Sequence, residues 1–160
     1  MFTGREIATT LTELGVTHAI WVPDSEMGAW EAELEAAKAL TLLRVCREGE
    51  AWPLAAGLHL GGAAPLVIMQ VTGLFESGDA LRNVLFDLEL PIFAILGARS
   101  WSVKGSRDSA RRFSLPILDA WGIDRAIVER PGDEPELAAH YRRCRQAGRP
   151  GAVLVAEGRP

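Results

Sequence analysis

Short apolar runs alternate with amphipathic segments along the whole chain. Each run has the length of a β-strand, and several are apolar throughout, which is typical of strands buried on both faces of a parallel sheet. The six runs are residues 19–22, 41–45, 65–69, 91–96, 125–128 and 151–155.

The segments between these runs have the spacing of helices. Residues 5–14 place Ile7, Leu11 and Leu14 on one stripe, and Asp24 and Ser25 are a good N-cap pair for the next helix. Six strand–helix alternations predict one domain over residues 1–160, a three-layer α/β/α fold with a six-stranded, mainly parallel sheet. The expected helices are residues 5–14, 26–38, 48–60, 77–88, 112–121 and 134–147.

Composition narrows the function classes. The 160 residues are 48% hydrophobic and carry a net charge of −4, which argues against a general nucleic-acid partner. No apolar run is long enough to span a membrane, and no apolar segment of a signal peptide follows the N-terminus. Cys46 and Cys144 lie far apart in the sequence. We therefore expect a soluble, cytoplasmic protein with reduced thiols.

Candidate ligand-binding segments follow the predicted strands. Open parallel sheets bind ligands beyond the carboxyl ends of their strands. The segments at those ends are residues 23–25, 46–48, 70–73 and 97–100. The longest irregular stretch, Ala98 to Ala110, is expected to form a mobile loop at the same edge.

Glu48 is the most informative residue at this edge. It follows a predicted buried strand and opens a predicted helix, with Glu50 in the same turn. Carboxylates in a first helical turn are stabilised by about 0.3–1 kcal/mol through the helix dipole. Position alone therefore favours a structural role for Glu48.

The surrounding residues form a longer pattern. Arg47-Glu48-x-x-Ala51-x-x-x-Ala55-x-Gly57 resembles the helix that carries the invariant glutamate of thiamine diphosphate enzymes. Residues 15–25 resemble the first strand and Val-Pro-x-Ser loop of that family, and residues 66–74 resemble its third strand and Ser-Gly-x-Gly turn. The resemblance covers essentially the whole chain and is greatest to the α subunits of split sulfopyruvate and phosphonopyruvate decarboxylases. It implies a pyrimidine-binding domain with a flavodoxin-like fold.

The resemblance also implies roles for individual residues. Glu48 would be catalytic, sharing its proton with the pyrimidine N1′ so that the 4′-amino group can act as a base, and dry apolar surroundings would favour this. Glu48, Thr72, Gly73, Leu74 and Phe75 would contact the cofactor. Substrate would lie near Asp24, Ser25 and Arg99, although Arg99 is equally well explained by a surface ion pair.

The other half of the cofactor site is expected on a partner. The family holds Mg²⁺ and the diphosphate with Gly-Asp-Gly and a later asparagine, whereas here Glu134 follows Gly132-Asp133 and Ala80 follows Gly78-Asp79. We therefore expect no metal ligands in this chain and a diphosphate-binding β subunit that carries the motif. A homodimer alone and an α2β2 or larger complex with the partner are expected, through apolar residues of helices 48–60 and 77–88: Trp52, Leu54, Leu58, Leu85 and Phe86.

Two departures from the family leave alternatives open. Phe75 and Glu76 stand where related chains have glycine and asparagine. A phenylalanine at a tight turn would narrow the pocket or cover the pyrimidine ring. The first hypothesis is a subunit of a decarboxylase for a small anionic 2-oxoacid, and the second is a carboligase subunit using the same acyl anion. A non-catalytic regulatory or scaffold relative is the third, favoured by Phe75 and Glu76 but disfavoured by Glu48.

Overall fold

A computed structural model describes residues 2–158 and contains one six-stranded sheet. The strand order is β2-β1-β3-β4-β6-β5, and all five neighbouring pairs are parallel. The predicted α/β fold with a parallel sheet is confirmed, and each strand lies within two residues of its predicted range. The strands are β1 (His18–Trp21), β2 (Thr41–Arg44), β3 (Pro65–Gln70), β4 (Phe93–Ala98), β5 (Asp124–Val128) and β6 (Gly151–Ala156).

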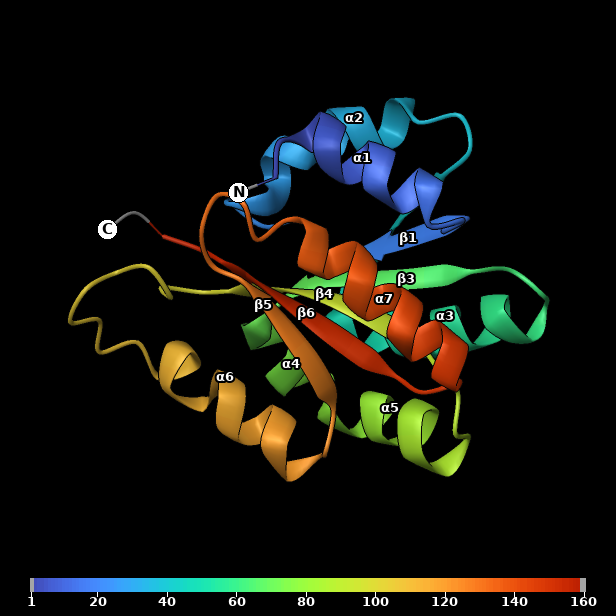
Figure 1. Cartoon of the computed structure of the whole chain (residues 1–160). Helices are drawn as coiled ribbons and strands as arrows, with labels where there is room; N and C mark the ends of the chain where they lie inside the picture. The colour runs from blue at the N-terminus through green and yellow to red at the C-terminus, as the bar shows by residue number, and fades with distance from the viewer. Residues whose placement is uncertain (1, 159–160) are drawn as a thin grey trace.

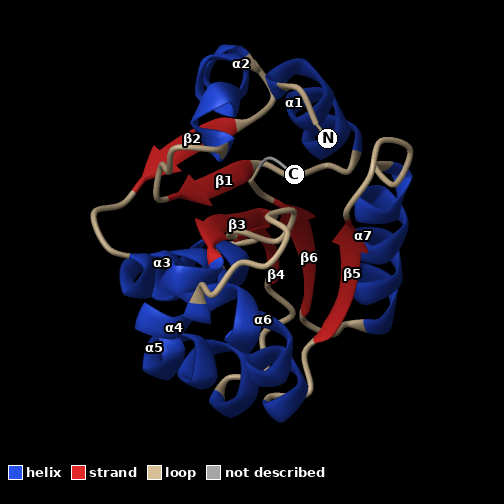
Figure 2. Ribbon diagram, turned by 90° about the vertical axis from the view of Figure 1, so that its left-hand side faces the viewer, coloured by secondary structure: helices blue, strands red, loops and turns tan. Residues whose placement is uncertain are grey.

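Helices cover both faces of the sheet, as Figures 1 and 2 show. One face carries α1 (Gly4–Glu13), the 3₁₀ helix η1 (Met27–Trp30), α2 (Glu31–Ala36) and α7 (Pro135–Ala147). The other face carries α3 (Glu48–Leu60), α4 (Val71–Glu76), α5 (Gly78–Arg82), the π-helical turn η2 (Asn83–Asp87) and α6 (Ser109–Ala120). Three layers result, with an apolar core on each side of the sheet.

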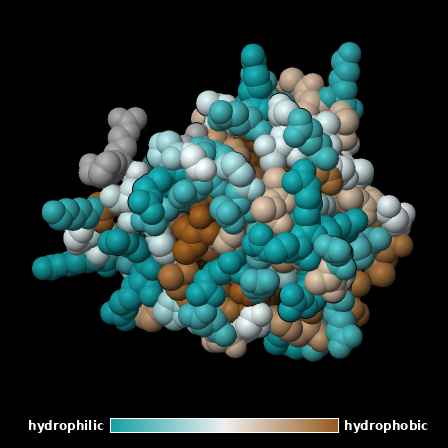
Figure 3. All heavy atoms as spheres, viewed as in Figure 1, coloured by the Kyte–Doolittle hydropathy of each residue, from teal (hydrophilic) through white to brown (hydrophobic). Residues whose placement is uncertain are grey.

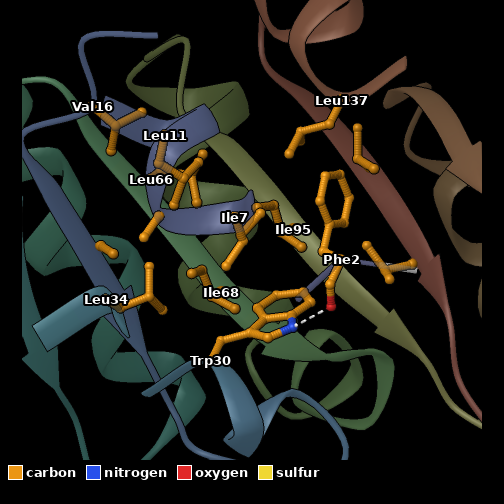
Figure 4. Packing of buried hydrophobic residues seen from close by; sticks show 14 of the residues in the cluster. Phe2, Ile7, Leu11, Val16, Trp30, Leu34, Leu66, Ile68, Ile95 and Leu137 are labelled. Carbon is orange, nitrogen blue, oxygen red and sulfur yellow. Dashed lines mark hydrogen bonds between the residues drawn. The ribbon is translucent and has the colours of Figure 1, made fainter. Parts of the chain in front are cut away.

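The core under α1, α2 and α7 is closed at one end by Trp30. Figure 4 shows its indole NH donating to the Phe2 carbonyl, at 3.1 Å, with the Phe2 ring edge-on to the indole. Ile7 and Leu11 of α1 pack onto the same face of the sheet. Residues 66–69 of β3 are fully buried, as the uniformly apolar run predicts.

Some predicted elements differ from the observed ones. The predicted helix 26–38 is a 3₁₀ turn followed by a short α2, and 77–88 is α5 followed by a π turn in which the Leu88 NH donates to the Asn83 carbonyl. The predicted turn after β3 is instead the helix α4. Within α4, Gly73 has no side chain and packs closely against Glu48 of α3.

The interface prediction was wrong for Trp52 and Leu85. Both belong to the core, where they are 1% and 4% exposed. Leu54 and Phe86 are exposed as predicted, at 38% and 39%. Figure 3 shows one face of the molecule, where hydrophobic areas alternate with hydrophilic side chains. Among the described residues, no helix is long and apolar enough to cross a membrane.

Candidate functional site

Glu48 is the first residue of α3 and lies beside α4. The chain enters α3 from β2 through an extended Arg47, so that Glu48 projects from the carboxyl edge of the sheet. A Cβ added to Gly73 would lie only 2.7 Å from Oε1 and 2.8 Å from Cδ of Glu48. The Glu48 side chain therefore rests directly on the backbone of Gly73. That both residues contact a cofactor stays a prediction.

The carboxyl group of Glu48 is half-buried. One side is covered by Gly73, and within residues 2–158 no side-chain or backbone group donates a hydrogen bond to it. The dry surroundings expected from the sequence are thus incomplete in this chain alone. In this chain alone, the outer side of Glu48 stays open to solvent.

Glu76, one of the two departures from the family pattern, fixes the start of α3. Its Oε1 accepts from Arg47 Nη2 at 2.5 Å and from Nε at 3.2 Å, and its Oε2 accepts from the Gly49 NH at 2.8 Å. The Arg47 guanidinium and the Gly49 NH hold the pKa of the Glu76 carboxyl below its usual range. Glu76 therefore caps a helix whose N-cap residue provides no side-chain bond.

A buried hydrogen bond holds the same two helices together on the core side. Trp52 Nε1 in α3 donates to Ser77 Oγ, directly after α4, at 2.8 Å. Both side chains are almost completely buried. Together with the Glu76 contacts, this bond fixes α3 relative to α4, and with it the position of Glu48 over Gly73.

The other predicted cofactor residues, Thr72, Leu74 and Phe75, lie in three different surroundings. Thr72 lies at the start of α4, where its hydroxyl donates to Gln70 Oε1 at 3.1 Å. The Leu74 side chain is buried in the core, so only its backbone faces the site. Phe75 points toward α6 and lines an apolar cavity of about 440 Å³ with Phe113 and Ile117. The Phe75 ring thus lies against α6.

The three predicted substrate residues lie in one cavity. Asp24, Ser25 and Arg99 line a volume of about 360 Å³ beyond the carboxyl ends of β1, β3, β4 and β6. Asp24 Oδ1 accepts from the backbone NH groups of Glu26 and Met27, both at 2.8 Å, while its Oδ2 is buried without a partner among the described residues. The first loop therefore keeps one Asp24 carboxylate oxygen buried and unpaired, among the described residues, in the wall of the cavity.

Arg99 is held at the rim of this cavity. Its Nε donates to Asp108 Oδ2 at 3.1 Å, and the Ser100 hydroxyl donates to the same oxygen at 2.9 Å. The Ala110 NH, Ser100 and Arg99 together lower the pKa of Asp108. The surface ion pair considered for Arg99 is therefore present. Its contact with a substrate stays a prediction.

Sequence reasoning missed Glu157 in this cavity, where it lies beside Gln70 of the candidate segment 70–73. Glu157 directly follows β6 and is 3% exposed, and its Oε2 accepts from Gln70 Nε2 at 2.8 Å. Burial, and then the charge of Asp24, raise the pKa of Glu157 to about 7. The sequence carried the signal, because Glu157 stands at the carboxyl end of a predicted strand, where ligands bind in such sheets.

One set of possible metal ligands occurs among the described residues. Asp124, His140 and Cys144 lie within 4.8 Å of one another, beside the start of β5. His140 Nε2 is 3.2 Å from the Asp124 carbonyl, and its Nδ1 is 3.2 Å from Arg143 Nη2. Because both ring nitrogens already have partners, the cluster is explained as a packing contact beneath β5 and β6.

Comparisons with known proteins agree with this geometry. The chain is 28% identical over 151 residues to a phosphonopyruvate decarboxylase of Streptomyces viridochromogenes, and 33% identical over 151 residues to one of Streptomyces hygroscopicus. The matches cover 91% and 92% of this chain but only 37% of each of those proteins. No protein-family model matches the chain.

A shorter relative is matched over most of its length. The chain is 26% identical over 132 residues to the sulfopyruvate decarboxylase subunit alpha of Methanothermobacter thermautotrophicus. This match covers 82% of the chain and 77% of that subunit. The chain is therefore related to the phosphonopyruvate and sulfopyruvate decarboxylases.

Proposed function

We propose that this chain is the pyrimidine-binding subunit of a thiamine diphosphate-dependent 2-oxoacid decarboxylase. The observation that carries the proposal is the Glu48 carboxyl group, resting on the bare backbone of Gly73 at the carboxyl edge of a parallel sheet. The similarity to three decarboxylases supports it. The Glu76 contacts and the Trp52–Ser77 hydrogen bond hold α3 against α4, and with it the Glu48 carboxyl group against Gly73. A scaffold protein would not need this arrangement.

The residues of this chain fit the pyrimidine end of the cofactor. Thiamine diphosphate, when bound, would supply a nucleophilic carbon for the oxoacid carbonyl and a thiazolium ring that takes up the electron pair left by the departing CO₂. Glu48 would hold a proton at the pyrimidine N1′, and the absence of a side chain at Gly73 leaves room for the Glu48 side chain in this position. Thr72 would border the same ring. Asp24, Ser25 and Arg99 would contact the substrate.

The remainder of the enzyme would come from a second polypeptide. A β subunit with the Gly-Asp-Gly motif and its asparagine would hold Mg²⁺ and the diphosphate, and it would cover the half-buried Glu48 carboxyl. Because the isolated chain lacks that cover and the diphosphate site, it should bind thiamine diphosphate weakly. We propose an α2β2 or larger assembly acting on a small anionic oxoacid in the cytoplasm.

The test is reconstitution with a candidate β subunit, followed by measurement of cofactor-dependent CO₂ release from pyruvate, phosphonopyruvate and sulfopyruvate. Glu48→Gln should preserve folding and cofactor binding but lower kcat by about 10²–10⁴-fold, the range for a positioned acid–base group. Glu50→Gln is the matched control, because Glu50 is exposed and bonds only the Cys46 NH among the described residues. Equal activity of wild type and Glu48→Gln would refute the mechanism.

The alternatives give different results in the same experiment. Condensation of the oxoacid with a second carbonyl compound, in place of simple CO₂ release, would identify a carboligase. Complex formation without cofactor-dependent turnover of any oxoacid would identify a non-catalytic relative.

A further inference from the structure

Basic residues are concentrated between the end of β4 and the first turn of α6. Residues 99–112 contain five of the 17 lysines and arginines of the chain but only one of its 21 acids, Asp108. Because the whole chain has a net charge of −4, this segment is a strongly cationic part of an acidic protein. Figure 1 shows it as a loop that leaves the sheet beside the end of β6 and returns to α6. The basic residues are Arg99, Lys104, Arg107, Arg111 and Arg112.

Contacts with β6 and with α6 determine the course of this loop. The Ser102 NH donates to the Glu157 carbonyl, directly after β6, at 3.0 Å. At the other end of the loop, Nη1 of Arg111 in α6 donates to the Val103 carbonyl at 3.2 Å. The loop is thereby tied to the sheet on one side and to α6 on the other, so its basic side chains have a defined arrangement.

Asp108 pairs with only one of the five basic side chains. Its Oδ2 accepts from Arg99 Nε at 3.1 Å and from the Ser100 hydroxyl at 2.9 Å, and its Oδ1 accepts from the Ala110 NH at 2.9 Å. These donors lower the pKa of Asp108, so its carboxylate stays ionised and bound to them. Within residues 2–158, no carboxylate pairs with the other four basic residues, which are Lys104, Arg107, Arg111 and Arg112.

Three of these arginines line a single cavity. Arg107, Arg111 and Arg112 border a volume of about 540 Å³, together with Ser106 and the paired Asp108. The guanidinium of Arg112 lies over the Phe113 ring, 4.4 Å from its centroid, which restrains its position. A guanidinium group is a rigid fork of donors that matches the oxygens of anions. Three forks around one cavity need several acceptor oxygens, and a tetrahedral oxyanion presents three or more where a carboxylate presents two.

We propose that this cavity binds a tetrahedral oxyanion, a phosphate, phosphonate or sulfonate group, through the guanidinium groups of Arg107, Arg111 and Arg112. The ion pair between Arg99 and Asp108 joins the cavity to the one that contains the predicted substrate residues, because Arg99 lines that cavity and Asp108 lines this one. Two sources supply such a group: a free anion, or the second acidic group of an oxoacid that lies in the neighbouring cavity. The binding site itself does not depend on the proposed function.

The test is a titration of the ¹⁵N-labelled chain with inorganic phosphate, at neutral pH and at an ionic strength kept constant with chloride. The Nε–H resonances of Arg107, Arg111 and Arg112, each identified by its absence in the corresponding glutamine variant, should shift together and saturate. Each glutamine variant should bind phosphate at least about tenfold more weakly, because it removes a charge-assisted hydrogen bond. Arg145→Gln is the matched control and should leave the affinity unchanged, since Arg145 is an exposed arginine of α7 outside the cavity.

Arg107→Gln is the most informative of the three variants. Arg107 is exposed and makes no hydrogen bond or ion pair with the described residues, so its replacement removes no contact that holds the loop. A loss of phosphate binding in this variant is therefore not explained by a disturbed fold. Phosphate affinity equal to wild type in Arg107→Gln and Arg111→Gln would overturn the inference. Shifts that do not saturate, or that chloride alone reproduces, would also overturn it.

Parallel titrations with pyruvate and phosphonopyruvate distinguish the two sources of the anion. Phosphonopyruvate that binds at least about tenfold more tightly than phosphate would assign the site to the second acidic group of an oxoacid, because the rest of the molecule then adds contacts. Equal affinities would assign it to a free anion. Pyruvate that shifts the three arginine resonances as strongly as phosphate does would overturn the preference for a tetrahedral group. These titrations measure binding alone, so a failure of the decarboxylase assay would refute the proposed function without deciding this inference.

Discussion

Replacement of Gly73 by alanine should displace the Glu48 carboxyl without unfolding the chain. The new Cβ would overlap Cγ of Glu48 and lie 2.7 Å from Oε1 and 2.8 Å from Cδ, whereas non-bonded carbon atoms are most favourably about 3.5–4.0 Å apart. The Glu48 side chain must therefore move by at least about 1 Å from Cγ outward. Glu48 is half-buried and can swing toward solvent, which limits the steric cost. Alanine within a helix also gains about 0.5–1 kcal/mol over glycine, which offsets part of that cost.

The catalytic effect should be much larger than the effect on stability. A displacement of about 1 Å in a catalytic group costs about 10²-fold in rate. We therefore expect kcat for CO₂ release by the reconstituted Gly73→Ala complex to fall by about that factor, with a urea midpoint close to wild type. Gly78→Ala is the matched control, since its Cβ would meet only Trp121 at an ordinary 3.5 Å.

Two results would refute this reasoning. Wild-type kcat in Gly73→Ala would show that the position of Glu48 over Gly73 does not matter for turnover. A loss of activity that parallels a large drop in the urea midpoint would show that Gly73 acts through folding.

The remaining predictions concern stability and assembly. Ser77→Ala leaves the buried Trp52 NH without its acceptor and should lower the free energy of unfolding by about 1–3 kcal/mol, measured by urea denaturation. The folded chain keeps the Glu157 proton up to about pH 7, but the unfolded chain releases it near pH 4.5. The free energy of unfolding of the wild type should therefore fall as the pH rises from 4.5 to about 7, and level off above that. Glu157→Gln should be more stable than wild type by up to about 3 kcal/mol at pH 8, and should have no advantage at pH 4. Serine at both Leu54 and Phe86, the two exposed apolar side chains of the predicted interface, should weaken self-association of the isolated chain, measured by light scattering.

The fold was predictable because its signals are local. Uniformly apolar runs identify strands buried on both faces, and Glu48 begins α3 at the predicted residue. The length of α5 was not predictable, since the π turn after it depends on how residues 88–92 lead into β4. Burial of Trp52 was also missed, because an isolated helix pattern does not reveal that Ser77, 25 positions later, accepts its NH.

The site was only partly predictable for a similar reason. Asp24 and Arg99 could be placed at one sheet edge from the ends of their strands, and they do line one cavity. The bond between Glu76 and the start of α3 joins segments far apart in the sequence, so the sequence alone showed Glu76 only as a departure that favoured a non-catalytic relative. The end of its strand could have placed Glu157 at the carboxyl edge of the sheet, but its position near Asp24 and Gln70 depends on the strand order, which cannot be read from the local pattern.

The position of β6 has a consequence for how the chain folds. This strand comes after all the others in the sequence, yet it lies between β4 and β5 and pairs with both. Until residues 151–156 are in place, β4 and β5 have unpaired edges, and such edges favour association with other chains. Parallel pairing of β4 with β6 also closes a long loop, which slows folding. The cavity around Glu157 should therefore be among the last parts of the molecule to form, and intermediates that lack it should be those most prone to aggregation.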